Sequence, residues 1–261
     1  MLSALFVSTR IGRSLGREFD MSAYNVTVGM PVHNARYFIT DAIASVLSQD
    51  YKKFELIIVD DASTDGTAAI LNNYRKIPNI RIVTNKKRLG RSASRNIIIK
   101  LSKGRYLSAC DADDLMLQGN LRVLSGYLDR HPDVGVVYGD MKVVKLDRKG
   151  KIMGPAKIRG RDCNHTWDLF DNAVNHPGSM LRKSEVLKAG GYDETVSYVD
   201  DLSLWLKMAE ITRFKYLAGK VYYVWRRHPH SHSMKTLTSR DRKDLRRIRF
   251  EAVRRRYKSV L

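Results

Sequence analysis

Two aspartates of the segment CDADD have the spacing of a metal-binding pair. Asp111 and Asp113 directly follow the predicted strand 105–110, and side chains two apart in an extended segment point the same way. Carboxylates so placed can hold Mn²⁺ or Mg²⁺, which keeps room in its shell for phosphate oxygens and water. Such a site suits the chemistry of a diphosphate, because the cation stabilises negative charge on a leaving group. The same spacing is common in turns, so the pair alone leaves a structural role open.

A second pair of aspartates occupies the equivalent place after another predicted strand. Asp60 and Asp61 follow residues 54–59, a continuous apolar run typical of a strand buried on both faces of a parallel sheet. Strand-like segments alternate with segments of helical periodicity, which indicates a doubly wound α/β sheet. In such sheets ligands bind at the carboxyl ends of the strands, where both aspartate pairs fall. The expected strands are 25–32, 54–59, 80–84 and 105–110, and the expected helices are 37–49, one that ends near 74, and 91–102.

The pattern of the chain changes after residue 115. A helix and a short strand lead to a basic segment with Gly and Pro, typical of a loop, and then to further helices and strands. No internal repeat or clean linker divides the sequence, so we expect one domain. The expected elements are helices 117–129, 180–188 and 200–210, strands at 134–138 and within 214–225, a loop at 145–161 and a basic helix from about 238.

The 261-residue chain has a net charge of +20, and three segments hold nearly all of it. Residues 86–105 contain eight basic side chains and no acidic one, residues 142–161 contain eight against one, and residues 240–258 contain ten against three. Such blocks suit phosphate-rich partners, namely a nucleotide diphosphate, an anionic membrane or nucleic acid. The alternative is a solvated surface that keeps the protein soluble.

Cysteine content and hydropathy narrow the class of protein. The two cysteines, Cys110 and Cys163, make neither a disulfide framework nor a zinc ligand set, and a reducing cytoplasm is the expected compartment. No apolar run reaches the roughly 18–20 residues that span a bilayer. We expect residues 1–22 to form a flexible leader, because Met21 comes just before the first strand.

Seven motifs occur along the chain in a characteristic order. They are MPVHNA, SVLSQDYKKFELIIVDDASTDGT, NKKRLGRSASRNIII, KGRYLSACDADD, LRKSEVLKAGGYDE, DDLSLWLKMAE and YVWRRHPHSHS. In this order, from Val26 to Ser233, they resemble the family 2 glycosyltransferases of GT-A fold. The resemblance implies a single α/β domain, Rossmann-like, with a mostly parallel twisted sheet flanked by helices. It also implies transfer of a sugar from a nucleotide diphosphate to an acceptor hydroxyl.

The resemblance divides the chain into parts. Residues 23–235 would form the glycosyltransferase domain, with a nucleotide-sugar half at 23–115 and an acceptor half at 116–235. Residues 236–261 would form a basic amphipathic C-terminal helix.

The donor roles follow from the same resemblance, residue by residue. Asp61 would bond the base or the ribose, with Asp60 supporting the turn or capping a helix. Arg95 would contact the base or the diphosphate. The family usually has a tyrosine where this chain has His33, whose ring can also stack on a base. The other predicted donor contacts are Pro31, Val32 and Asn34 in the base pocket, Asp111 and Ala112 near the ribose, and Arg226 at the phosphates.

The metal ligands implied by the resemblance come from two motifs. Asp113 would be the main ligand of Mn²⁺ or Mg²⁺, Asp111 would assist it, and His228 would be a ligand or a phosphate contact. Asp114 would shape the following turn or cap a helix. The donor would be a nucleotide sugar, and uridine is the base that the resemblance favours.

A pair of aspartates, Asp200 and Asp201, stands where the family carries its catalytic base. The resemblance makes Asp201 the base, which would take the proton from an acceptor hydroxyl as its oxygen attacks the anomeric carbon. One such displacement inverts the anomeric configuration. Capping of a helix is the alternative for this pair. Trp205 would be a core residue or a wall beneath the acceptor sugar.

Three hypotheses for the acceptor remain open at this point. The first is an enzyme in the cytoplasm, peripheral at the inner membrane face, that acts on a cell-envelope or lipid-linked saccharide, with the basic helix 240–258 docked on anionic lipid. The second is an enzyme that glycosylates a hydroxylated base in DNA, with the basic loop 142–161 on the duplex. The third is an inactive module that binds nucleotide sugars or nucleic acid, which the presence of Asp61, Asp113 and Asp201 together disfavours.

Overall fold

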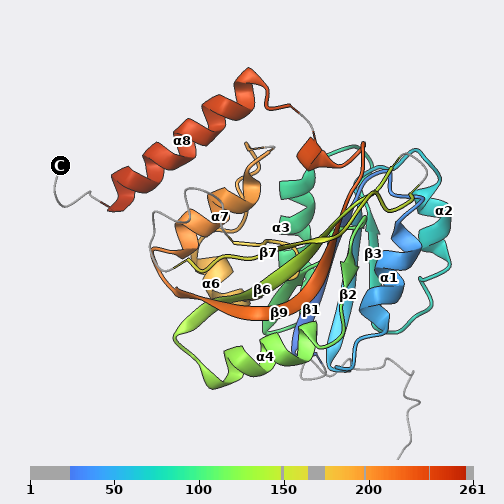
Figure 1. The fold of residues 1–261 in the computed structure, drawn as a ribbon, viewed down its shortest axis with the longest axis horizontal. Coiled ribbons are helices and arrows are strands. Elements are labelled where there is room, and N and C mark those ends of the chain that lie inside the picture. The colour runs from blue at the N-terminus through green and yellow to red at the C-terminus, as the bar shows by residue number, and fades with distance from the viewer. Residues whose placement is uncertain (1–23, 148–149, 164–173, 197, 235, 257–261) are drawn as a thin grey trace, which may run out of the picture.

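One twisted sheet with helices on both faces forms the body of the protein, as the computed structural model in Figure 1 shows. The structure describes residues 24–147, 150–163, 174–196, 198–234 and 236–256. The predicted leader 1–22 lies outside the described residues, as do residues 257–261 of the predicted C-terminal helix.

The first half of the sheet alternates strands and helices. Its elements are β1 (Val26–Val32), α1 (Ile39–Leu47), β2 (Phe54–Asp60), α2 (Thr67–Asn72), β3 (Ile80–Thr84), α3 (Arg91–Leu101) and β4 (Tyr106–Ala109). β1 pairs in parallel with β2 and β4, and β2 pairs in parallel with β3. All seven residues of β2 are buried, because helices cover both faces of the sheet. The carboxyl ends of these strands therefore meet at one edge, where both aspartate pairs begin.

The second half of the sheet mixes strand directions. Its elements are β5 (Leu115–Met116), α4 (Asn120–Arg130), β6 (Val134–Lys145), β7 (Lys157–Arg159), β8 (Met180–Arg182), α6 (Lys183–Lys188), α7 (Asp200–Met208), β9 (Arg213–Arg227), η1 (His232–Met234) and α8 (Ser239–Arg256). The strand order is β3-β2-β1-β4-β8-β6-β9-β5, with β7 paired to β6. β8 runs antiparallel to both of its neighbours, and β6 runs parallel to β9. The second half thus continues the sheet beyond β4, away from β1, β2 and β3.

Three expectations for the second half were wrong. The helix expected over 180–188 begins only at Lys183, because Met180–Arg182 form a buried strand between β4 and β6. The strand expected at 134–138 extends to Lys145, since it pairs along its length with the long β9. The loop expected at 145–161 contains β7, which pairs with residues 141–143 of β6. In each case a partner strand from elsewhere in the chain determines the structure, and local sequence does not contain that information.

The core is divided between the two faces of the sheet. The larger cluster lies under α1 and α4, and a second cluster gathers around α7 and the middle strands β8 and β6. Trp205 is fully buried in the second cluster, where it meets the ring of Phe214 edge-on at 5.9 Å. The core role predicted for Trp205 is therefore confirmed.

The described chain ends in α8, which lies across the outer side of α7 (Figure 1). Ile248 and Ala252 are buried in the cluster around α7, and Leu245 packs against the same cluster. Arg247 forms an ion pair with Asp193 at 3.3 Å. Ile248 and Ala252 thus pack within the protein, whereas Phe250 of the same helix is 69% exposed. No helix in the described residues has the length and apolar character that crossing a membrane requires.

Candidate active site

A cleft of about 1080 Å³ opens at the carboxyl ends of β1, β2 and β4. It lies between the loops that follow these strands, the start of α7 and the segment after β9. The predicted site residues that line it are Pro31, Val32, His33, Asn34, Asp61, Arg95, Asp111, Ala112, Asp113, Asp201 and His228. Asp60 and Arg226 are both buried and do not line the cleft.

Asp61 holds the loop between β3 and α3. Its carboxylate accepts hydrogen bonds from the backbone amides of Leu89 at 2.7 Å and Gly90 at 2.8 Å, and from the Asn85 side chain at 2.9 Å. Gly90 has a φ of +97°, a conformation that favours glycine because it carries no Cβ. Asp61 therefore shapes the cleft wall at the place where the resemblance assigns it contact with the donor.

The turn after β2 is built by polar side chains. The buried Asp60 accepts a hydrogen bond from the amide of Ser63 at 3.1 Å, which fits a turn-supporting role. The His33 ring donates from Nδ1 to the carbonyl of Asp61 at 2.8 Å. Asn34 has a φ of +55°, and its side-chain oxygen accepts the amide of Thr64 at 2.8 Å. These bonds join the loop after β1 to the loop after β2, so the predicted base pocket has a fixed floor.

Asp113 and His228 converge from distant segments of the chain. Nε2 of His228 lies 3.0 Å from Oδ2 of Asp113, and the Asp113 side chain is 32% exposed toward the cleft. The His228 ring stacks on Phe38 with ring centroids 4.4 Å apart, which fixes its orientation. Asp111, 27% exposed, lies on the same cleft wall. An imidazole and two carboxylates thus face one region of the cleft.

Asp114 is the buried member of this aspartate cluster. It accepts the backbone amide of Arg226 at 2.8 Å, which ties the loop after β4 to β9. Burial and the neighbouring carboxylates of Asp113 and Asp111 raise the pKa of Asp114 well above its usual value. A cation at the cluster would lower that pKa, because it would offset the negative charge. The accumulation of carboxylates here is the observation that fits a divalent metal.

The described residues contain no group of three or more His, Cys, Asp and Glu side chains arranged as a complete metal site. Mg²⁺ in phosphate-transfer sites is often held by one or two carboxylates, with the remaining ligands supplied by phosphates and water. The pair of Asp113 and His228, with Asp111 beside it, fits a metal that is completed by its substrate.

Arg226 braces the cleft from behind. Its guanidinium donates to the carbonyl of Asp113 at 2.6 Å and to the carboxylate of Asp41 at 3.0 Å, and it lies over the ring of Phe38. These contacts place the guanidinium between α1 and the loop that carries Asp113. In this structure the position predicted to contact phosphate supports the loop that carries Asp113.

A buried ion network connects the two halves of the cleft. Arg95 contacts Asp111 at 3.2 Å and also forms an ion pair with Asp200, which is fully buried. Arg91, one helical turn earlier, forms a second ion pair with Asp200. Burial alone would raise the pKa of Asp200, but Arg91 and Arg95 outweigh it and hold that pKa well below its usual range. The carboxylate beside the predicted base is therefore a fixed negative charge.

Arg91 was not among the predicted site residues. Its position four residues before Arg95 on a helix is a signal that both side chains share one face, which could have indicated a joint role. The partner, Asp200, lies more than 100 residues further along the chain, so the pairing itself is not readable from the sequence.

Asp201 faces the cleft from the first turn of α7. It is partly exposed, and its Oδ1 accepts the backbone amide of Leu202 at 2.8 Å. Arg159 of β7 lines the same cleft, where burial lowers its pKa and the charge of Asp201 counteracts that effect. The two neighbouring aspartates thus differ in their surroundings. Asp200 is held in ion pairs with Arg91 and Arg95, whereas Asp201 lines the cleft.

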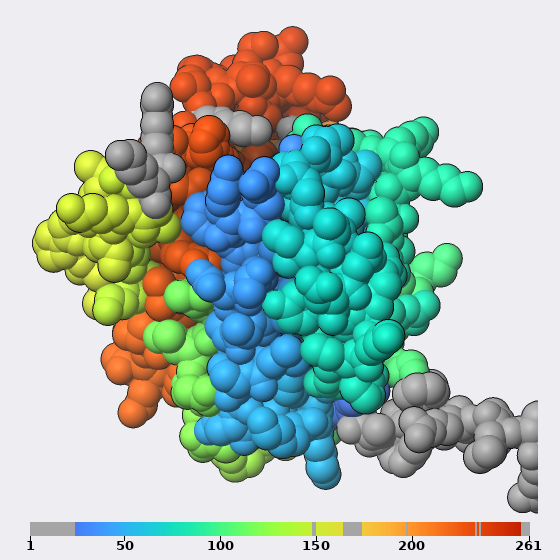
Figure 2. Space-filling model, turned by 90° about the vertical axis from the view of Figure 1, so that its right-hand side faces the viewer, coloured from blue at the N-terminus to red at the C-terminus, as the bar shows by residue number. Residues whose placement is uncertain are grey.

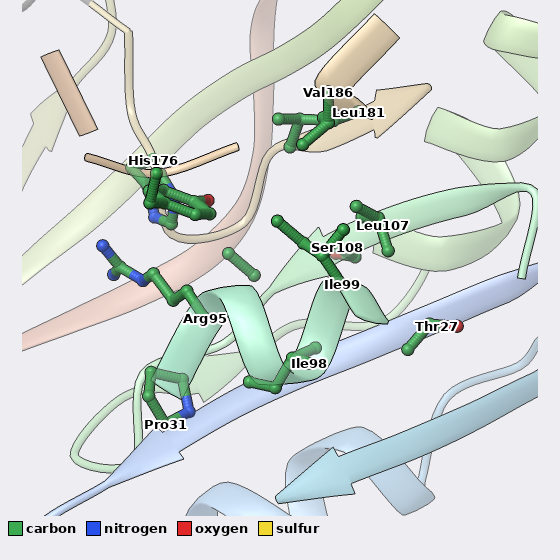
Figure 3. A pocket seen from close by; sticks show the side chains of 13 residues that line it. Thr27, Pro31, Arg95, Ile98, Ile99, Leu107, Ser108, His176, Leu181 and Val186 are labelled. Carbon is green, nitrogen blue, oxygen red and sulfur yellow. The ribbon is translucent and has the colours of Figure 1, made fainter. Parts of the chain in front are cut away.

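A small apolar cavity of about 30 Å³ lies behind this ion network. Figure 3 shows Arg95 and His176 at one end of it, with Ile98, Ile99 and Leu107 among the apolar side chains that line the rest. The cavity and its apolar walls keep water away from the rear of Arg95, and this strengthens its ion pairs.

His176 closes the rear of the site as a neutral ring. Its Nε2 lies 2.6 Å from the hydroxyl of Tyr192, and the ring packs against Trp205. Burial, with Arg95 as a second cause, lowers the pKa of His176 well below its usual value. No sequence pattern indicates a role for this residue, since it is a lone histidine outside the recognised motifs.

Stability should fall in mild acid because of His176. The unfolded histidine takes up a proton near pH 6.5 while the folded ring stays neutral, so the native state loses stability as pH drops below 6.5 and loses none above it. The loss by pH 5 should be about 2 kcal/mol of the free energy of unfolding. Urea unfolding of the wild type and His176→Gln between pH 7 and pH 5 measures it. In His176→Gln the free energy of unfolding should change less with pH, whereas His230→Gln should show the same pH dependence as the wild type. The same pH dependence in all three proteins would contradict the assignment of this loss to His176.

The twisted α/β sheet with aspartate loops at its strand ends defines the GT-A class of fold. The sequence profile of the family Glycosyl transferase family 2 matches residues 27–191, and the chain belongs to that family. This confirms the predicted family, the fold class and the glycosyltransferase class of enzyme.

Individual relatives agree with this assignment. The Escherichia coli UDP-Glc:alpha-D-GlcNAc-diphosphoundecaprenol beta-1,3-glucosyltransferase WfgD is 30% identical over 139 residues, which cover 53% of this chain and 54% of WfgD. S. aureus TarS in complex with UDP-GlcNAc has a TM-score of 0.69 at 21% identity, over 86% of this chain and 64% of TarS. The mannosyltransferase PcManGT from Pyrobaculum calidifontis, in complex with GDP-Man and Mn²⁺, has a TM-score of 0.59 at 20% identity, over 92% of this chain and 65% of PcManGT. This chain therefore spans between half and two thirds of these proteins.

Proposed function

We propose that the chain transfers a sugar from a UDP-sugar to a hydroxyl of a cell-envelope saccharide, with inversion at the anomeric carbon. The observation that carries the proposal is one cleft lined by Asp113 and His228 on the metal side and by Asp201 on the other. The division of residues 23–115 as the donor half and 116–235 as the acceptor half is part of this proposal.

The donor lies along the loops that follow β1 and β2. His33 and Asn34 form the base pocket, and Asp61 meets the ribose while it holds the loop before α3. The choice of uridine is supported by the UDP-sugar named in WfgD and by the UDP-GlcNAc bound to TarS. Arg91 and Arg95, at the start of α3, bring positive charge to the side of the cleft where the diphosphate would lie.

Asp201 acts as the base. It takes the proton of the acceptor hydroxyl as that oxygen forms a bond to the anomeric carbon, while the bond from that carbon to the diphosphate oxygen breaks. The proton ends on Asp201, and the nucleoside diphosphate leaves with the electron pair. The attack comes from the face opposite the leaving group, so the configuration inverts. Asp200, fixed by Arg91 and Arg95, keeps the first turn of α7 in place.

Asp113, Asp111 and His228 are the proposed ligands of Mn²⁺ or Mg²⁺. The metal, when bound, neutralises charge on the leaving diphosphate. Its support is the convergence of Asp113 and His228 together with the raised pKa of Asp114. The structure of PcManGT is a complex with GDP-Man and Mn²⁺, which agrees with this choice.

The metal assignment predicts a selective effect at His228. His228→Ala should weaken Mn²⁺ binding by about 10–100-fold, since a residue that ligates or orients a ligand usually contributes that much. His230→Ala is the matched control, because His230 lines the same cleft on the same loop and is exposed. Titration of Mn²⁺ monitored by electron paramagnetic resonance measures both variants. Equal loss in the two, or none in His228→Ala, would contradict the assignment.

The acceptor is proposed to be a lipid-linked saccharide at the cytoplasmic face of the membrane. The support is WfgD, whose name specifies a diphosphoundecaprenol-linked acceptor. A peripheral position on an anionic bilayer would bring such an acceptor to the cleft.

A donor screen for released nucleoside diphosphate tests the function. We expect release from a UDP-sugar that requires Mn²⁺ or Mg²⁺ and increases with a lipid-linked saccharide. Stimulation by hydroxymethylated DNA in place of the saccharide would instead support the DNA-modifying alternative. No release from any nucleotide sugar would support an inactive binding module.

A further inference from the structure

The hairpin formed by the end of β6 and by β7 projects from the body of the protein. We define the basic arm as the described residues 145–147 and 150–161. Figure 2 shows it as a lobe that stands out at the side of the molecule. Every residue from 151 to 160 is exposed, although Lys157–Arg159 pair with β6. The arm therefore has a defined backbone and almost no packing of its own.

Large apolar side chains are concentrated on the basic arm. Ile152 is 62% exposed, Met153 is 59% exposed and Ile158 is 61% exposed. These three are a third of the large exposed apolar side chains in the described residues, and they fall within seven positions. Such a local concentration in water marks an interaction surface.

The charge of the arm is almost entirely positive. Lys145, Lys151 and Lys157 are exposed beside the three apolar residues. Asp147 is the one acidic residue between 142 and 161. Apolar side chains next to lysines match the boundary of a bilayer, where the former enter the acyl layer and the ammonium groups remain among the phosphates.

We propose that the basic arm docks the protein on an anionic lipid bilayer. A nucleic acid would pair with the lysines but would leave Ile152, Met153 and Ile158 in water, whereas a bilayer accommodates both sets. On α8 the apolar residues Ile248 and Ala252 are buried in the cluster around α7, which leaves Phe250 as its one large exposed apolar side chain among the described residues, against three on the arm.

The arm is directly connected to the cleft. Arg159 lines the cleft, while its neighbour Ile158 is exposed. Docking through the arm would hold the cleft close to the membrane surface. This last step rests on the proposed transfer to a lipid-linked saccharide, but the docking itself does not.

Vesicle sedimentation with the full chain, without donor or acceptor, tests the docking. The wild type should sediment with phosphatidylglycerol–phosphatidylcholine vesicles and not with phosphatidylcholine alone. The triple variant I152S/M153S/I158S should lose at least about tenfold in partitioning. The control L187S/I211S removes two exposed apolar side chains outside the arm and should sediment as the wild type does.

A second variant separates charge from apolar contact. K145Q/K151Q/K157Q should lose about 100-fold in partitioning to anionic vesicles, since each basic residue near such a surface contributes roughly a factor of five. Wild-type sedimentation by I152S/M153S/I158S would overturn the proposal. Binding to duplex DNA would also overturn the proposal if the wild type and I152S/M153S/I158S bind DNA at physiological salt and K145Q/K151Q/K157Q does not. The arm would then bind nucleic acid.

The two proposals fail in different ways. If the transfer proposal is wrong, vesicle binding persists without nucleoside diphosphate release. If the docking proposal is wrong, the arm variants retain full transfer to a lipid-linked acceptor in vesicles as well as to a detergent-dispersed one.

Discussion

Asp201→Asn should lower kcat for sugar transfer by about 10²–10⁴-fold, because an amide cannot take the proton of the acceptor hydroxyl. Asp201 lies at the cleft wall, and the printed ion pairs of Arg91 and Arg95 at the start of α7 are made to its neighbour Asp200. The substitution should therefore leave the fold and the donor affinity unchanged. Release of nucleoside diphosphate in the presence of acceptor measures the effect.

The control for this prediction is the free energy of unfolding of the same variant. Asp201→Asn should differ from the wild type by less than about 0.5 kcal/mol, as expected for a partly exposed side chain. Turnover near the wild-type rate in a folded variant would exclude Asp201 as the base.

Asp200→Asn should produce the opposite pattern, a large loss of stability. The substitution leaves Arg91 and Arg95 with Asp111 as their remaining carboxylate in the network. Removal of one partner of a buried ion pair leaves uncompensated charge in a low-dielectric site, which costs about 3–5 kcal/mol. Urea unfolding at neutral pH measures this loss in the free energy of unfolding.

The two neighbouring substitutions control each other. Both replace an aspartate by asparagine at the start of α7, so a general effect of the helix dipole would change both proteins alike. A loss below about 1 kcal/mol in Asp200→Asn would mean that the network contributes little to stability. In that case Asp200 would not fix the position of α7.

The convergence of the aspartate loops at the cleft could be predicted largely from the sequence. The continuous apolar run before Asp60 and Asp61, and the strand before Asp111, indicate parallel strands, and the carboxyl ends of parallel strands meet at one edge. The structure brings Asp61, Asp111 and Asp113 to the same cleft. The order of motifs then predicted the family, which the sequence profile confirmed.

The supporting contacts of the site could not be predicted in this way. The pairing of Arg95 with Asp200 and the contact of Arg226 with Asp41 join segments more than 100 residues apart. No local pattern encodes such a pair, because it depends on how the sheet brings two helices together. Arg226 was expected at the phosphates for the same reason, since the sequence cannot distinguish an arginine that faces a ligand from one that braces a loop.

The lengths of the strands in the second half could not be predicted from the sequence either. The strand expected at 134–138 continues to Lys145 only because β9 provides a partner along its whole length. The loop expected at 145–161 carries β7 because residues 141–143 of the extended β6 provide its partner. The apolar residues Ile152, Met153 and Ile158 of this segment indicate an interaction surface only because they are exposed, and their exposure is known only from the structure.

In the proposed function, Asp113 serves the donor and the metal, and Asp201 serves the acceptor as the base. Calorimetric titration of a UDP-sugar in the presence of saturating Mn²⁺ tests this most directly, with the wild type, Asp113→Asn and Asp201→Asn compared. We predict equal Kd values for the wild type and Asp201→Asn, and a Kd at least about tenfold weaker for Asp113→Asn. A loss of donor affinity in Asp201→Asn as large as that in Asp113→Asn would contradict the separate roles proposed for these two aspartates.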